Sequence, residues 1–110
     1  MHIQVLYFEK CPNYLRAVDN LNTALKELSR GRDAKVTLEL VKNQAEAEEI
    51  MFVGSPQIMV EHRDLFGTPA DATYGLRCRI YLFGGKALGT PTVADFKEAL
   101  KKLPFTERHA

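Results

Sequence analysis

The sequence predicts a single α/β domain in which strands and helices alternate along the chain. Short runs with alternating or continuous apolar side chains indicate strands, and longer segments with apolar residues every three or four positions indicate helices. With 110 residues, the chain is long enough for one domain with its own hydrophobic core. We expect this domain to span residues 1–104, and residues 105–110 to form a C-terminal tail.

The first half of the chain is predicted to run strand, helix, strand, helix. Residues 3–8 are largely apolar on both faces, which is typical of a central strand covered on both sides. Apolar side chains then recur at helical spacing over residues 14–30, and Gly31 suits the end of that helix. The alternating residues 34–41 indicate a second strand, and a short helix is expected over residues 44–52.

The second half contributes two strands and a helix. A short apolar run over residues 57–61 follows Gly-Ser-Pro and predicts the third strand. A long connection over residues 62–77 leads to residues 78–83, whose alternation predicts the fourth strand. Arg77 and Arg79 flank Cys78 and could raise its reactivity or bind an anion, although alternating charges on a strand usually face solvent. The last helix is expected after a capping box, with helical spacing at Val93, Phe96, Leu100 and Leu103.

Cys11 lies where the first strand ends and the first helix begins. Unpaired backbone N–H groups and the positive end of the helix dipole favour a thiolate at such a position. Lys10 adds a nearby cation, and Pro12 suits the first helical position because it has no N–H to leave unpaired. These features predict a reactive cysteine, although a buried and inert Cys11 is the alternative.

Composition excludes several classes of function. The net charge of +1 gives no electrostatic basis for nucleic-acid binding. No apolar segment is long enough to span a membrane, and the N-terminus lacks the pattern of a signal peptide, so we expect a cytoplasmic protein. The chain has only 2 cysteines, too few for a disulfide scaffold. No metal site is expected, because no metal-ligand spacing relates the cysteines to His2, His62 and His109.

The predicted order β-α-β-α-β-β-α, with Cys11-Pro12 opening the first helix and Ser55-Pro56 opening the third strand, resembles the thioredoxin fold. Within that family, the chain is similar to small bacterial thioredoxin-like proteins with a Cys-Pro-Asn-Tyr motif. The resemblance implies a central mixed four-stranded sheet flanked by helices. It also implies that Cys11 is the attacking cysteine and that Pro56 is a cis-proline beside it. The Ser55 backbone would then be available to bind an extended substrate.

The chain departs from the family at Tyr14, which stands where a dithiol protein has its second cysteine. Glutathione or a partner thiol could instead resolve a mixed disulfide, Cys78 could do so, or no redox turnover occurs. If residues 78–83 form a strand that ends near the site, Cys78 begins about 17 Å away at ~3.3 Å per residue. A disulfide needs Cα atoms within about 7 Å, so a buried and inert Cys78 is the default expectation.

The leading functional prediction is thiol–disulfide exchange through the single motif cysteine, Cys11. The substrate would be a protein or small-molecule disulfide, with an external thiol as reductant and glutathione as a candidate co-substrate. Pro12, Tyr14, Ser55 and Pro56 are the expected substrate-binding residues, although an aromatic residue such as Tyr14 more often serves in packing. The alternatives are a non-catalytic module that binds a peptide or partner, and a metal carrier that uses both cysteines.

Overall fold

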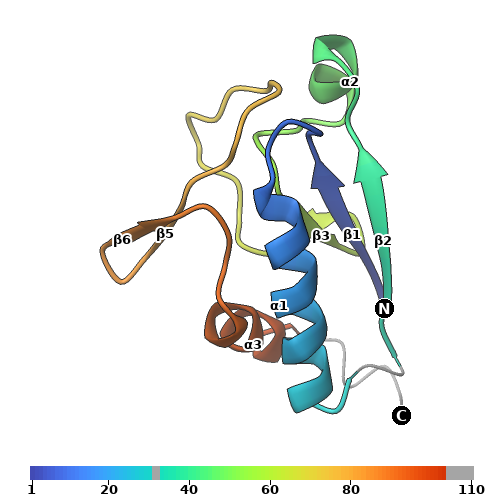
Figure 1. The fold of residues 1–110 in the computed structure, drawn as a ribbon, viewed down its shortest axis with the longest axis vertical. Coiled ribbons are helices and arrows are strands. Elements are labelled where there is room, and N and C mark those ends of the chain that lie inside the picture. The colour runs from blue at the N-terminus through green and yellow to red at the C-terminus, as the bar shows by residue number, and fades with distance from the viewer. Residues whose placement is uncertain (31–32, 104–110) are drawn as a thin grey trace.

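The computed structural model describes residues 1–30 and 33–103 as a mixed α/β structure (Figure 1). Its helices are α1 (Asn13–Glu27), α2 (Gln44–Glu49) and α3 (Val93–Lys101). Its strands, in chain order, are β1 (His2–Tyr7), β2 (Lys35–Leu40), β3 (Gln57–Val60), β4 (Arg63–Asp64), β5 (Tyr81–Phe83) and β6 (Lys86–Leu88).

A mixed four-stranded sheet forms the centre of the molecule. Its strand order is β2-β1-β3-β4, with β1 and β2 parallel and the other two pairs antiparallel. The β5 and β6 strands form a separate two-stranded hairpin, which projects away from this sheet at the left of Figure 1. The predicted α/β class with a mixed four-stranded sheet and helices is therefore confirmed.

Helices α1 and α3 cover the same face of the sheet and pack against each other (Figure 1). The buried side chains between sheet and helices are Ile3, Val5, Ala17, Leu21, Ala24, Leu25, Ile58, Val60, Phe96 and Leu100. On the opposite face, only the end near α2 is apolar and buried, with Leu6, Val41, Ala47 and Phe52. The rest of that face carries His2, Gln4, Thr37 and Glu39, so the prediction that β1 is covered on both sides is wrong for its first half.

The fourth strand of the sheet is not the predicted one. Residues 63–64 pair with β3 through a two-residue turn whose Glu61 and His62 have φ values of 49° and 69°. Positive φ at both central residues is the geometry that joins tightly paired antiparallel strands. Of the predicted strand over residues 78–83, only Tyr81–Phe83 is a strand, and it pairs with β6 outside the sheet.

The helix ends differ modestly from the predictions. The α1 helix ends at Glu27 with Leu28 as its C-cap, and Pro12 is its N-cap rather than its first helical residue. The α2 helix ends at Glu49 instead of residue 52. The predicted capping box of α3 is present: Thr92 Oγ1 accepts from the Asp95 N–H, and Asp95 Oδ2 accepts from the Thr92 N–H. The predicted C-terminal tail, residues 105–110, and the Gly31 helix stop lie outside the described residues.

Among the described residues, no helix is both long enough and apolar enough to cross a membrane.

A buried ion pair attaches the segment before β5 to the fourth strand of the sheet. Arg79 Nη1 donates to Asp64 Oδ2 at 2.7 Å, and Nη2 donates to the Gly67 carbonyl at 2.7 Å. The Arg79 guanidinium also lies over the ring of Tyr81, 4.5 Å from its centroid. The side chains of Arg79 and Asp64 are only 8% and 6% exposed, so the expectation that Arg79 faces solvent is wrong.

We predict that Asp64→Ala lowers the free energy of unfolding by about 3–5 kcal/mol, because it leaves the Arg79 charge buried without its partner. The matched control is Glu27→Ala, which removes the exposed ion pair between Lys97 and Glu27. That change should cost less than about 1 kcal/mol. Urea unfolding followed by circular dichroism measures both values, and equal losses in the two variants would contradict the prediction.

Candidate functional site

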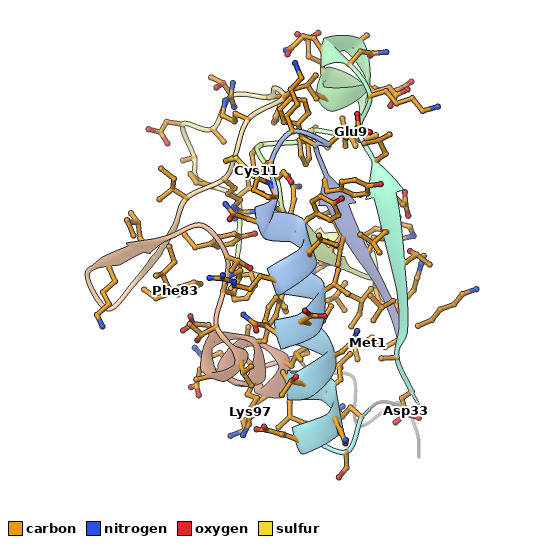
Figure 2. The ribbon with its side chains drawn as sticks, in the orientation of Figure 1. Met1, Glu9, Cys11, Asp33, Phe83 and Lys97 are labelled. Carbon is orange, nitrogen blue, oxygen red and sulfur yellow. A yellow bond between two sulfur atoms is a disulfide. The ribbon has the colours of Figure 1, made fainter. Side chains whose placement is uncertain are left out.

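The two cysteines form a disulfide bond at the end of the molecule that carries α2. Cys11 immediately precedes α1 and Cys78 belongs to the connection between β4 and β5, and their Cα atoms are 5.7 Å apart. Figure 2 shows Cys11 at the N-terminal end of α1, where the first strand turns into the helix. Its N–H donates to the Phe8 carbonyl at 3.0 Å, which closes this turn. A direct sulfur–sulfur link therefore joins positions 67 residues apart in the sequence.

Cys78 lies beside Cys11 because residues 77–79 form β-type backbone hydrogen bonds with Ser55. The Ser55 N–H donates to the Arg77 carbonyl at 2.7 Å, and the Arg79 N–H donates to the Ser55 carbonyl at 2.8 Å. The result is an isolated parallel bridge between Ser55 and Cys78. The pairing continues backwards, since the Gly75 N–H donates to the Phe52 carbonyl at 3.0 Å.

Gly54 allows the two backbones to come this close. Its φ of 150° lies in a region that side chains rarely adopt. A Cβ at this position would also lie 2.9 Å from the N, Cα and Cβ atoms of Arg79. The glycine therefore sets both the local conformation and the approach of the Cys78 segment.

Three predictions about this region are wrong. Cys78 is not buried, because the structure shows it as an exposed residue of the disulfide. Cys78 is not about 17 Å from the site, because its segment is not the start of a strand continuous with β5; it lies beside Ser55 instead. The Ser55 backbone is also not available to an extended substrate. Its N–H and its carbonyl are both bonded to residues 77–79 of the same chain. The chain thus occupies its own predicted substrate position.

The other predicted site residues lie around the disulfide in different ways. Pro12 is exposed, and the Ser55–Pro56 peptide bond is cis, as predicted for Pro56. The ring of Tyr14 stacks on Tyr7, with centroids 4.1 Å apart, as the packing interpretation expects. Ser55 is fully buried, and its hydroxyl has no hydrogen-bond partner among the described residues. Its carbonyl oxygen lies 3.5 Å from Cys11 Sγ, which as a disulfide sulfur has no hydrogen to donate.

Tyr81 stabilises the segment beside the disulfide, and the sequence did not identify it as a site residue. Its buried hydroxyl donates a hydrogen bond to the Pro56 carbonyl. Burial raises the pKa of the Tyr81 phenol well above its ordinary value, the Asp64 carboxylate raises it further, and Arg79 opposes the shift. The phenol therefore remains a hydrogen-bond donor throughout the neutral range. The roles of Gly54 and Arg79 were missed in the same way, because they depend on contacts between distant segments.

The expectation that the chain holds no metal site stays a prediction. In residues 1–30 and 33–103, no three His, Cys, Asp or Glu side chains are grouped so that they could hold a metal ion. Both cysteines are engaged in the disulfide. His109 lies outside the described residues.

No protein-family model, no curated protein and no solved structure matches this sequence.

We predict that Gly54→Ala shifts the equilibrium between the Cys11–Cys78 disulfide and glutathione toward the reduced protein by about tenfold or more. Overpacking typically costs about 1–3 kcal/mol, and about 1.4 kcal/mol is tenfold in an equilibrium constant. Gly84→Ala is the control, since Gly84 also has a positive φ of 55° but a Cβ there meets open space. Alkylation and mass measurement after equilibration in glutathione buffers give the reduced fraction. An unchanged equilibrium in Gly54→Ala would contradict the proposed role of the close approach.

We also predict a pH dependence from Tyr81. Its pKa is raised in the folded state, so the neutral phenol contributes stability that is fully present below the unfolded pKa of about 10 and is lost as the pH rises above it. Tyr81→Phe should lower the free energy of unfolding at pH 7 by about 1–3 kcal/mol, since the buried Pro56 carbonyl loses its donor. The difference between wild type and variant should shrink above pH ~10. Urea unfolding at neutral and alkaline pH measures this difference, and a gap that widens with pH would contradict the assignment.

Proposed function

We propose that this protein carries out thiol–disulfide exchange through a pair of cysteines, Cys11 and Cys78. The single observation that supports the proposal is the disulfide between them, formed at the N-terminal end of a helix by a segment paired with Ser55. This modifies the mechanism predicted from the sequence, in which Cys11 acts without a second cysteine of its own chain. Cys78, whose participation was one of three alternatives in that prediction, becomes part of the leading mechanism.

The exchange balances as a two-electron reaction. An external thiolate attacks one sulfur of the Cys11–Cys78 bond, forms a mixed disulfide with it, and releases the other cysteine as a thiolate. A second external thiolate attacks the mixed disulfide and releases the remaining cysteine. The protein disulfide is thereby reduced to two thiols, and two external thiols are oxidised to one disulfide. In the opposite direction, an external disulfide is reduced to two thiols and the protein dithiol is oxidised to the Cys11–Cys78 disulfide.

Thioredoxin-like architecture is part of this proposal. The sheet order β2-β1-β3-β4, with one parallel and two antiparallel pairs, is compatible with that fold. Cys11 stands between β1 and α1, where the resemblance places the reactive cysteine. The β5–β6 hairpin outside the sheet and the pairing of residues 77–79 with Ser55 are features of this chain that the resemblance did not predict.

The predicted cytoplasmic location favours a redox role over a structural one. Disulfides in reducing compartments are usually transient and belong to catalytic or redox-sensing sites. A purely structural bond would stabilise the protein by restricting the unfolded chain. For a separation of 67 residues the chain-entropy model gives about 4 kcal/mol. Both roles need the same bond, so reversibility under native conditions distinguishes them.

We expect the oxidised protein to be reduced by glutathione under native conditions and to accelerate the reduction of insulin disulfides by dithiothreitol. The probes are glutathione buffers of fixed ratio, followed by alkylation and intact mass, and insulin precipitation. Cys11→Ser and Cys78→Ser should each abolish turnover, because a single cysteine cannot complete the two-step exchange within the chain. Asn22→Ala, an exposed change in the middle of α1, is the control and should leave turnover unchanged.

A disulfide that resists glutathione until the protein unfolds would contradict the redox function and identify the bond as structural. Turnover that persists in Cys78→Ser would support the single-cysteine mechanism instead.

A further inference from the structure

We propose that Cys78, and not Cys11, is the sulfur that exchanges with external thiols and disulfides. The inference rests on the proposed function and reverses the roles that the sequence suggested. Cys11 then acts as the resolving cysteine: it is the leaving group when the protein is reduced, and it attacks the mixed disulfide on Cys78 when the protein is reoxidised.

The difference in burial between the two cysteines supports this order. Cys11 is 0% exposed, whereas Cys78 is an exposed residue. Cys11 is enclosed by the turn that follows β1, and its sulfur lies against the Ser55 carbonyl. An external thiolate must come into contact with the sulfur that it attacks, on the side opposite the sulfur that leaves. Of the two residues only Cys78 is exposed, so we assign this contact to its sulfur.

A hollow beside Cys78 provides room for the incoming thiol. Its volume is about 390 Å³, which falls in the usual range of about 300–1,000 Å³ for small-molecule sites. Cys78 belongs to its lining and Cys11 does not. The lining combines apolar and charged residues, namely Val53, Pro69, Asp71, Ala72, Thr73, Arg77, Arg79 and Ile80.

Arg77, the neighbour of Cys78 in the chain, favours an anionic thiol such as glutathione, whereas the Asp71 carboxylate in the same lining opposes it. Arg77 is exposed at this hollow, and its guanidinium is held by the Thr73 carbonyl at 2.7 Å. Arg79 is buried against Asp64 and adds little net charge at the rim. A cation at the hollow attracts the attacking thiolate toward it.

In the reducing direction, a glutathione thiolate forms a bond to Cys78 Sγ while the Cys78–Cys11 bond breaks. The electron pair of that bond leaves on Cys11 Sγ as a thiolate, which can take up a proton. A second glutathione thiolate then attacks the glutathione sulfur of the mixed disulfide and releases the Cys78 thiolate. The products are glutathione disulfide and the protein dithiol, so atoms and electrons balance.

The first test locates the mixed disulfide in the wild-type protein. The oxidised protein is mixed briefly with glutathione, quenched with acid and N-ethylmaleimide, and mapped by peptide mass spectrometry. We expect glutathione on Cys78 and N-ethylmaleimide on Cys11 in the same molecules. Glutathione mainly on Cys11 would overturn the inference and leave the proposed exchange intact. A disulfide that glutathione does not open at all would instead overturn the proposed function itself.

A second test compares single-cysteine variants. Reduced Cys11→Ser, which keeps Cys78, should react with oxidised glutathione at least about tenfold faster than Cys78→Ser, because a buried sulfur reacts only after local opening. In 6 M guanidinium chloride the two rates should converge, which separates burial from intrinsic reactivity. Faster native reaction of Cys78→Ser would overturn the assignment. Circular dichroism identifies a variant that has lost its fold, and the wild-type mapping decides the question in that case.

A matched pair of charge substitutions tests the approach through the hollow. Ile80 is 68% exposed and lines the hollow, whereas Leu82 is 75% exposed on β5 and does not. Ile80→Glu should slow reduction of the disulfide by glutathione roughly twofold to fivefold, and Ile80→Lys should accelerate it, since both effects act through local charge. Leu82→Glu should have a smaller effect. Equal effects of the two glutamate substitutions would contradict approach through the hollow.

Discussion

The pair of backbone hydrogen bonds between Ser55 and residues 77–79 is the interaction on which the rest of the site depends. These two bonds hold the Cys78 segment beside Ser55, where its sulfur can reach that of Cys11. The two bonds use the N–H and the carbonyl of Ser55, which precedes β3 and does not pair within the sheet. Because an unpaired buried backbone group is costly, the pairing both satisfies Ser55 and determines where Cys78 lies.

Arg79 stabilises the pairing between Ser55 and residues 77–79. Its backbone N–H bonds to Ser55, and its side chain bonds to Asp64 and to the Gly67 carbonyl. A buried arginine is tolerated only when its donors are satisfied, and here an aromatic ring, that of Tyr81, also covers the guanidinium. Tyr81 in turn bonds to the Pro56 carbonyl, so both sides of the Ser55–Pro56 segment are held by neighbouring residues of one short stretch.

Local patterns in the sequence predicted those parts of the fold that local physics determines. The spacing of apolar residues in α1 and α3 and the capping box of Thr92 and Asp95 involve only nearby positions, and the structure contains all of them. The partner of residues 77–79 was not predictable in this way. It depends on the absence of a side chain at Gly54 and on the Asp64 carboxylate, and neither feature has a signature in the neighbourhood of Cys78. The alternation up to Phe83 therefore suggested one continuous strand, and the distance estimate for Cys78 failed with it.

The contacts of Arg79 also determine what happens to Cys78 once the disulfide is open. None of them passes through sulfur, so the residue next to Cys78 stays anchored to Asp64, Gly67 and Ser55 when the bond breaks. The Cys78 sulfur, which carries glutathione at that stage of the proposed exchange, is then held one residue from this anchor and close to the Cys11 thiolate. A short tether gives a high effective concentration, and ring closure becomes fast compared with capture by a second external molecule. In the proposed exchange, this anchoring favours return to the disulfide over accumulation of the mixed disulfide.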